Sequence, residues 1–441
     1  MEIKELQNII QENGVVGAGG AGFPTYMKIS DKANTILMNC AECEPLLKLH
    51  RQLLEKHAYE IMQTFHMIAE TVGATEAIIG IKKSYVQTIN ALNQHIEEFP
   101  GMRLHLLEEV YPMGDEVVLI YEATGRVVRP GGLPIEQGVA VFNVETVYNV
   151  YRALAKKPVT DKYVSVVAEV SNPVTVRVPL GCTLDEVVAQ AGNVTVKDPV
   201  YFVGGPMMGR IGSGSEPVTK TTNAILVLPK DHLIVAKKQR TSSIDLKRAA
   251  SICCQCNSCT DLCPRHNLGH PIDPALFMRA ASNQDFRDLN PYIDASFCSS
   301  CGVCEMYACP QSLAPRSLLF DMKGGLRKAG IRPPQGVQPK PVTDAREYRK
   351  VPEERLMARL GLTRYDKDAP MDETLVPVKK VKVLLSQHIG APAQAIVKVG
   401  DEVTRGQMIA QPAQGLSVGI HASICGKVTE VTDRHIIIAA K

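Results

Sequence analysis

The sequence contains no tryptophan, and only 5% of its residues are aromatic. Few aromatic rings leave little surface on which nucleic-acid bases could stack. The formal net charge is only +3, and the basic residues are spread along the chain instead of forming a patch. We therefore expect no nucleic acid among the partners of this protein.

Long apolar runs are absent as well. No run approaches the roughly 18–20 residues that a membrane-spanning helix requires, and the first residues, MEIKELQNIIQENG, carry acidic side chains that are not typical of a secretory signal. Apolar residues make up 45% and charged residues 22% of the 441 positions, which is ordinary for a globular protein. We expect a soluble protein of about three or more domains in a reducing compartment, with no membrane span.

Cysteine, by contrast, is abundant, and eight of the 13 cysteines form two runs of similar spacing. The first run is Cys253-x₂-Cys256-x₂-Cys259-x₃-Cys263-Pro264, and the second is Cys298-x₂-Cys301-x₂-Cys304-x₄-Cys309-Pro310. Two such runs in tandem are typical of ferredoxins with two [4Fe–4S] clusters, in which the last cysteine of each run binds the other cluster. The spacing predicts Cys253, Cys256, Cys259 and Cys309 on cluster 1, and Cys298, Cys301, Cys304 and Cys263 on cluster 2.

Zinc and disulfides are the alternatives for these cysteines. A structural zinc site commonly uses two CxxC pairs, so a third cysteine at the same spacing followed by Cys-Pro is surplus to four-coordinate zinc. Disulfides are disfavoured in a reducing compartment, and the other cysteines are too scattered for a disulfide framework. Cys254 is left over in the first run, and we expect a packed or partly exposed thiol there.

A glycine-rich stretch lies near the amino terminus, from Gly14 to Thr25, and is followed by Lys28. Glycines at this density allow the backbone to approach a ligand and to point several N–H groups at a phosphate. The stretch is not a Walker A loop, because no GK[ST] follows, and no clear strand precedes it as a Rossmann fingerprint requires. Alone, it could equally be a flexible turn.

Hydrophobic patterns around this loop predict an α/β layer. Helices are expected at 2–12, 50–72 and 84–99, and strands at 35–39, 76–81, 102–107 and 139–143. Polar residues follow the strands at Asn39–Glu44 and Asn143–Thr146, and the carboxyl ends of strands are where open α/β folds bind ligands. No Ser/His/Asp pattern or other general acid–base site is present, so we predict no catalytic side chain.

Four segments in this order, GAGGAGFPTYMK, NCAECEP, YPMGDE and FNVET, carry a resemblance to a known family. They resemble the flavin-binding domain of the NADH-oxidising subunit of respiratory complex I. They are more similar still to the RnfC component of the Rnf electron-transport complexes and to the cobalamin reductases of propanediol utilisation. In this family the glycine loop and its lysine hold FMN. The resemblance implies that FMN is bound by Gly17, Gly19, Lys28, Asn39, Glu42, Gly114, Glu116 and Asn143.

The same resemblance implies that NADH is the electron donor and that Phe23 and Glu44 lie on its side of the site. One departure from the complex I pattern is Ala41, where complex I has aspartate, and this favours the Rnf-like branch of the family. His266 and His270, just after the first cysteine run, are expected to be structural. The alternative for these two histidines is a cobalamin-facing or proton-handling role.

The whole chain predicts a multidomain α/β + β fold. We expect an FMN- and NADH-binding α/β domain (1–158), a soluble-ligand-binding β-grasp (SLBB) domain (159–240) and a ferredoxin-like domain for two [4Fe–4S] clusters (241–330). A linker (331–372) with one helix near 353–360 and a barrel-sandwich hybrid domain (373–441) that resembles the amino-terminal domain of RnfC complete the chain. The β-grasp domain is either a ligand site or a rigid spacer. The barrel-sandwich stretch Pro412–His421 has no lysine to modify, which favours a docking module over a swinging arm.

The order of these domains, with the barrel-sandwich domain last, resembles the cobalamin reductases. The resemblance implies electron transfer from NADH through FMN and two clusters to cob(III)alamin or cob(II)alamin, which supplies cob(I)alamin to an adenosyltransferase. It also implies a cytoplasmic location inside a bacterial microcompartment for propanediol degradation, with shell proteins as partners. The alternatives are an Rnf-like protein that exchanges electrons between NADH and ferredoxin or flavodoxin, and a non-catalytic electron conduit bound to shell proteins.

Overall fold

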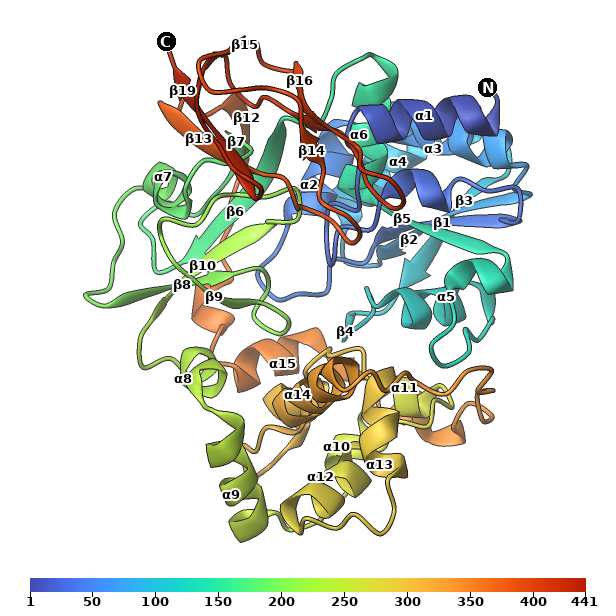
Figure 1. Ribbon diagram of the computed structural model, residues 1–441. Helices are drawn as coiled ribbons and strands as arrows, with labels where there is room; N and C mark the ends of the chain where they lie inside the picture. Colours follow the sequence, from blue (N-terminus) through green and yellow to red (C-terminus); the bar gives the residue numbers. More distant parts are fainter.

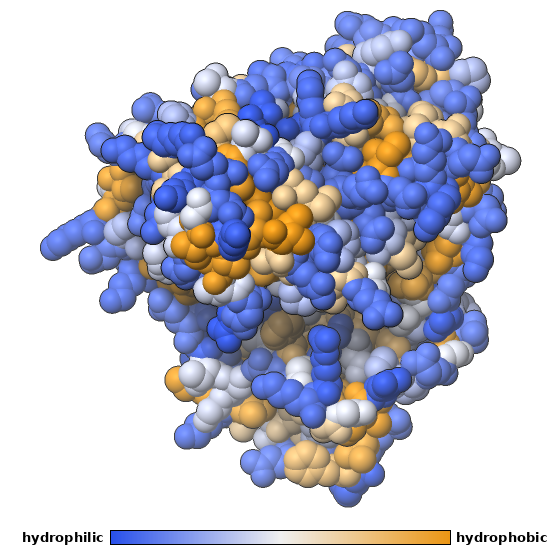
Figure 2. All heavy atoms as spheres, turned by 45° about the horizontal axis from the view of Figure 1, so that its top comes forward, coloured by the Kyte–Doolittle hydropathy of each residue, from blue (hydrophilic) through white to orange (hydrophobic).

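The computed structural model describes all residues from Met1 to Lys441. Figure 1 shows an α/β part, a β-rich part beside it, a helical part at the bottom that carries the two cysteine runs, and a small β part at the top. No helix combines the length and apolarity needed to cross a membrane. The surface in Figure 2 is mainly hydrophilic, with separate apolar patches.

The α/β part is built on a four-stranded parallel sheet in the order β3-β2-β1-β5. These strands are β1 (Thr35–Cys40), β2 (Glu76–Lys82), β3 (Met102–Leu107) and β5 (Val139–Asn143). Side chains alternate between two apolar cores: Ile36 and Met38 face one and Leu37 faces the other. Both faces are therefore buried, which explains the continuous apolar runs of the strands.

Helices cover both faces of this sheet. The first core contains residues of α1 (Ile3–Glu12), α2 (Leu49–Lys56), α3 (Ala58–Val72), α4 (Val86–Asn93) and α6 (Val144–Leu154), and the second contains residues of α5 (Glu116–Thr124). The prediction of one helix over 50–72 is wrong. The helix is interrupted at His57, whose backbone is non-helical and whose Nε2 lies 2.7 Å from Glu373 Oε1. The expected helix at 84–99 is also shorter, and a 3₁₀ turn replaces its end.

The β-rich part is a six-stranded mixed sheet in the order β12-β7-β6-β10-β8-β9. Its strands are β6 (Asp161–Ala168), β7 (Val174–Pro179), β8 (Pro199–Val203), β9 (Arg210–Gly212), β10 (Ala224–Pro229) and β12 (Met371–Leu375), with α7 (Leu184–Val188) and α8 (Leu233–Gln239). Thr183 and Glu186 form a capping box that starts α7. β12 lies parallel to β7, so a strand from far along the chain completes this sheet.

The cysteine runs lie in a helical part with a small apolar core of its own. Its helices are α9 (Ser242–Ile252), α10 (Ser258–Asp261), α11 (Pro264–Asn267), α12 (Pro274–Ser282), α13 (Asn290–Ile293) and α14 (Pro315–Lys328), together with a π-helix at Cys304–Ala308.

The stretch expected as a linker has more structure than its polar composition suggests. β11 (Val351–Pro352) pairs with β4 (Val110–Tyr111), and α15 (Glu353–Arg359) confirms the expected short helix. Leu356 and Leu360 are fully buried in a core that also contains residues of β10 and of the second cysteine run. This stretch therefore holds the helical part against the rest of the protein.

The carboxyl-terminal part has two small antiparallel sheets. One contains β13 (Lys380–Leu384), β15 (Glu402–Val403), β18 (Gly426–Val431) and β19 (His435–Ala440), and the other contains β14 (Gln394–Ala395), β16 (Met408–Gln411) and β17 (Ile420–His421). The stretch before β17 contacts the end of α1 and the start of the glycine-rich region. Gly419 N–H donates to the Gln11 carbonyl of α1 at 3.1 Å, and Lys220 Nζ donates to the carbonyls of both Gly14 and Gly419.

One buried carboxylate joins three parts of the molecule. Asp161, at the start of β6, accepts hydrogen bonds from Arg152 of α6, Arg177 of β7 and Arg405 before β16. Burial alone raises the pKa of Asp161, but the guanidiniums of Arg152 and Arg177 outweigh this effect and hold the pKa well below its ordinary value. The ionised carboxylate is therefore a point at which the sheets and the carboxyl-terminal part are held together.

Candidate functional site

The largest group of predicted site residues lies at the carboxyl edge of the parallel sheet. In the register of the strands, Asn39 of β1 pairs with Asn143 of β5, so the two asparagines lie side by side at this edge. A cavity of about 430 Å³ opens there. All ten residues expected at FMN or NADH line it: Gly17, Gly19, Phe23, Lys28, Asn39, Glu42, Glu44, Gly114, Glu116 and Asn143.

The glycine-rich loop forms one side of this cavity. It follows α1, not a strand, and leads into a 3₁₀ turn at Thr25–Lys28. The Gly17 N–H donates to the Phe23 carbonyl at 2.8 Å, which closes the loop on itself. Lys28 reaches back to the Val141 carbonyl at 2.7 Å and lies 3.8 Å from the Glu116 carboxylate. Burial lowers the pKa of Lys28, and Glu116 opposes that shift.

The two asparagines are held by hydrogen bonds of their side-chain amides. Asn39 Nδ2 donates to the Gly114 carbonyl at 2.9 Å, and Asn39 Oδ1 accepts the Ala41 N–H at 3.1 Å. Asn143 Oδ1 caps α6 by accepting from Glu145 N–H and Thr146 N–H. These contacts hold the strand ends and the loop at Gly114 in place, so that together they form one wall of the cavity.

His50 of α2 also lines the cavity, although no pattern in the sequence singled it out. Its Nε2 lies 3.2 Å from Asn143 Nδ2, and its backbone N–H donates to the Glu42 carboxylate. Burial lowers the pKa of His50 to about 4, so Nε2 is free to accept the Asn143 hydrogen bond at neutral pH. Burial likewise raises the pKa of Glu42, and the Arg51 charge and the His50 N–H oppose this.

Glu44 connects the cavity to the β-rich part. Its two carboxylate oxygens accept the N–H groups of Met207 and Met208, each at 2.9 Å. A Cβ at Gly205 would lie 2.1 Å from the Glu44 carboxylate, so any other residue there would displace this carboxylate. Burial raises the pKa of Glu44 to about 7, although the two N–H groups act in the opposite direction. This contact positions Met208 in the cavity wall.

The residues fit a flavin nucleotide on two observations. Thr25 Oγ1 and Asn223 Oδ1 are buried in the cavity wall without any hydrogen-bond partner, and buried polar atoms are normally paired. A side chain in place of Gly114 would lie 2.8 Å from the Ala41 carbonyl and 3.0 Å from Cys43 Sγ. The cavity wall thus offers polar atoms that have no partner within the protein, and at Gly114 it leaves no room for a side chain.

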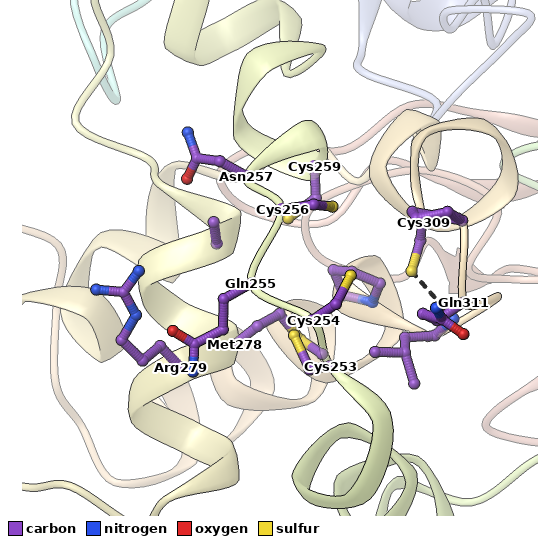
Figure 3. Close-up of a pocket in the computed structure, with 14 residues that line it drawn as sticks. Cys253, Cys254, Gln255, Cys256, Asn257, Cys259, Met278, Arg279, Cys309 and Gln311 are labelled. Carbon is purple, nitrogen blue, oxygen red and sulfur yellow. Dashed lines mark hydrogen bonds between the residues drawn. The ribbon is translucent and has the colours of Figure 1, made fainter.

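The eight predicted cluster cysteines form two groups. Cys253, Cys256, Cys259 and Cys309 line one small cavity, shown in Figure 3, and Cys263, Cys298, Cys301 and Cys304 line a second. Each group therefore contains one cysteine from the other run. No disulfide is present, and no three ligand-type side chains converge as they would around a single metal ion. A four-iron cluster spreads its thiolates more widely than one ion does.

The two loops share one feature of backbone conformation. The residues that flank the middle cysteine of each run, Gln255 and Asn257 in the first and Ser300 and Gly302 in the second, all have positive φ. Such turns wrap the backbone around a bound group and direct N–H groups toward it. Ser300 N–H donates to Cys298 Sγ and Leu313 N–H to Cys309 Sγ, both at 3.3 Å. The donor set and these loops fit iron–sulfur clusters.

The two groups differ in their surroundings. Cys256 of the first group is exposed, as is the neighbouring Cys254, whereas Cys301 and Cys304 of the second are buried. Cys301 also lines the large cavity, and Tyr111 Oη donates to its carbonyl at 2.6 Å. The second cysteine group is therefore adjacent to the predicted flavin cavity, while the first lies at the surface.

The two histidines after the first run have structural contacts. His270 is buried and its Nε2 lies 2.9 Å from the Val128 carbonyl, and His266 Nδ1 lies 2.9 Å from the Ile272 carbonyl.

Comparison with known families gives three matches along the chain. These are the Nuo51 FMN-binding domain over residues 10–152, the 4Fe–4S dicluster domain over 252–314 and the RnfC barrel-sandwich hybrid domain over 364–441. Together with the mixed sheets they confirm the predicted fold class. The last match begins inside the stretch expected as a linker.

A solved structure with a similar fold is an NAD⁺-reducing [NiFe]-hydrogenase in the H₂-reduced state. It has a TM-score of 0.51 and 20% sequence identity, and the match covers 76% of this chain and 63% of the hydrogenase chain. At this identity the likeness concerns the fold alone.

Curated relatives match at higher identity. A component of the Na⁺-translocating ferredoxin:NAD⁺ oxidoreductase complex of Acetobacterium woodii is 29% identical over 273 residues, 60% of this chain and 59% of its own. Cobalamin reductase PduS of Citrobacter freundii is 41% identical over 440 residues, 99% of this chain and 97% of its own. The protein of the same name from Salmonella typhimurium is 42% identical over 437 residues, 98% and 96% of the two chains. Since both PduS matches extend over nearly the whole length, this chain belongs to the cobalamin reductase PduS family of oxidoreductases.

Proposed function

We propose that this protein is an NADH-dependent cobalamin reductase that contains FMN and two [4Fe–4S] clusters and delivers electrons to cob(III)alamin and cob(II)alamin. The observation that carries the proposal is the position of Cys301, which lines both the large cavity and the second cysteine group. A flavin in the cavity and a cluster on that group would thus share one wall. Close, solvent-excluded placement is what a protein contributes to electron transfer between cofactors.

FMN would be held in the large cavity by the glycine loop and the strand ends. When bound, FMN supplies a group that accepts two electrons together as hydride and releases them one at a time. Lys28 would neutralise the phosphate, with the loop N–H groups beside it. The remaining contacts would come from Asn39, Glu42, Gly114, Glu116 and Asn143, and the residues bordering NADH would be Phe23 and Glu44.

The clusters would be held by the two cysteine groups in the crossed arrangement. Cys263, Cys298, Cys301 and Cys304 would bind the cluster near the flavin, and Cys253, Cys256, Cys259 and Cys309 the cluster near the surface. Their burial and exposure support an electron path from the cavity to the second group and outward to the first. We place the reduction of cobalamin at the exposed end.

The name of the relatives, cobalamin reductase PduS, supports the cellular setting that the sequence resemblance implies. We propose that the reduced product, cob(I)alamin, passes to an adenosyltransferase, and that the protein works in the cytoplasm inside a bacterial microcompartment for propanediol degradation, with shell proteins as neighbours.

The test is the anaerobic reduction of cob(III)alamin by NADH, followed by the corrin absorbance, with protein loaded with FMN and iron–sulfur clusters. We expect the native protein to reduce it, Cys301→Ala to be impaired, and Cys425→Ala to behave as native, because Cys425 is exposed and lies outside both cysteine groups. Loaded protein that passes NADH electrons to ferredoxin but never to cobalamin would overturn the proposal in favour of an Rnf-like role. Loaded protein whose flavin NADH does not bleach would indicate a non-catalytic conduit.

A further inference from the structure

Asn223, in the β-rich part, has a side-chain amide that makes no hydrogen bond to another residue of the protein. It directly precedes β10 and lines the large cavity, together with the residues of the α/β part. Asn223 Oδ1 is buried without a partner, and the amide Nδ2 makes no hydrogen bond within the chain either.

The backbone around Asn223 is fixed, so its side chain is held in place. A tight turn precedes it, in which Thr222 N–H donates to the Thr219 carbonyl and Thr222 Oγ1 accepts the Thr219 N–H, both at 3.1 Å. The Asn223 carbonyl accepts the Ser165 N–H of β6 at 2.9 Å. A Cβ on Gly19 would lie 3.2 Å from Asn223 Nδ2, so the amide packs over the glycine loop.

The buried Asn223 Oδ1 has no partner and therefore carries a desolvation cost that a bound ligand can remove. The amide offers one acceptor and two donor sites, which suit the hydroxyl, carbonyl and amide groups of a nucleotide cofactor. We propose that Asn223 is a cofactor-binding residue of the cavity and hydrogen-bonds such a group of FMN or of NADH. This inference rests on the proposed function of the cavity.

A second contact shows that the β-rich part is firmly connected to the cavity. Glu44 accepts the N–H groups of Met207 and Met208 from one side, and Lys238 Nζ donates to the carbonyls of Met207 and Gly209 from the other. These hydrogen bonds from both sides hold the loop that carries Met208 in its place in the cavity wall. On this proposal the β-rich part contributes to the binding site, which favours the ligand-site alternative over that of a rigid spacer.

The experiment compares native protein with Asn223→Ala and with the control Asn193→Ala, an exposed asparagine of the same part. FMN affinity is measured by flavin fluorescence on protein stripped of flavin, and the KM for NADH is measured at saturating FMN. We expect Asn223→Ala to weaken one of the two by about 5- to 10-fold, as for the loss of one hydrogen bond, and Asn193→Ala to change neither. A weaker FMN affinity identifies the flavin as the partner, and a raised KM alone identifies NADH.

Unchanged values for both ligands in Asn223→Ala, with native protein that binds FMN and oxidises NADH, would overturn the inference and leave the proposed function intact. Native protein that binds no FMN would instead refute the proposed function. Thermal unfolding and iron content show whether Asn223→Ala is folded and loaded with iron. If it does not fold, Asn223→Ser, which keeps a small polar side chain, replaces it.

Discussion

Replacement of Cys309 by alanine should remove the first cluster and spare the second, although Cys309 belongs to the second cysteine run in the sequence. Cys309 lines the same cavity as Cys253, Cys256 and Cys259, and none of the cysteines of the second group lines that cavity. With two four-iron clusters the native chain holds about eight iron atoms. The variant should therefore lose about four of them and keep the cluster beside the flavin cavity.

The assay is iron and sulfide content together with the EPR spectrum of dithionite-reduced protein, which needs no substrate. Cys256→Ala should remove the same EPR signal as Cys309→Ala, whereas Cys301→Ala and Cys263→Ala should both remove the other signal. The control Cys425→Ala should keep both signals. If Cys309→Ala instead lost the same signal as Cys301→Ala, each run would hold its own cluster, and the crossed grouping would be refuted.

Further predictions concern the flavin cavity and the stability of the chain. Lys28→Ala should weaken FMN binding by roughly 10- to 100-fold, the range for a hydrogen bond to a charged group, with Lys28→Arg less affected in the same fluorescence titration. Asp161→Asn should lower the free energy of unfolding by about 3 kcal/mol, because it removes the buried charge partner of three partly buried arginines. Arg287→Ala, which breaks an exposed pair, should change the free energy of unfolding by less than about 0.5 kcal/mol in urea unfolding. The pKa of Glu44 is raised to about 7 from 4.5, so folded protein retains a proton that the unfolded chain releases between these pH values. The free energy of unfolding should thus fall as pH rises through this window, and Glu44→Gln should lack that part of the slope; an identical slope in the variant would contradict the assignment.

The local patterns of the sequence predicted most of the cavity. The glycine loop and the polar strand ends at Asn39 and Asn143 are short-range signals, and parallel strands must bring their carboxyl ends to one edge of the sheet. The cysteine spacing is equally local, since each run wraps three of its thiols around one cavity. Elements such as β1 and β5 were predicted for the same reason, because strands buried on both faces are continuous apolar runs.

The contributions that the sequence did not reveal depend on contacts between distant parts of the chain. His50 lies in an ordinary helical pattern and meets Asn143 only after α2 packs beside the sheet. Met208 and Asn223 reach the cavity because the β-rich part docks on Glu44 and the glycine loop. Leu356 and Leu360 lie in a charged, proline-rich stretch whose composition indicated a linker, yet both are fully buried. The hydrophobic pattern of a short segment carries no information about such contacts with distant parts of the chain.

The crossed grouping of the cysteines also bears on how the protein is made. Cys309 completes the group that begins at Cys253, and Cys263 completes the group that begins at Cys298. The first group lacks its fourth thiol until the ribosome has passed residue 309, and both groups become complete only when the two runs come together. On the proposed crossed ligation, neither cluster would have all four of its ligands before both runs have been synthesised and brought together.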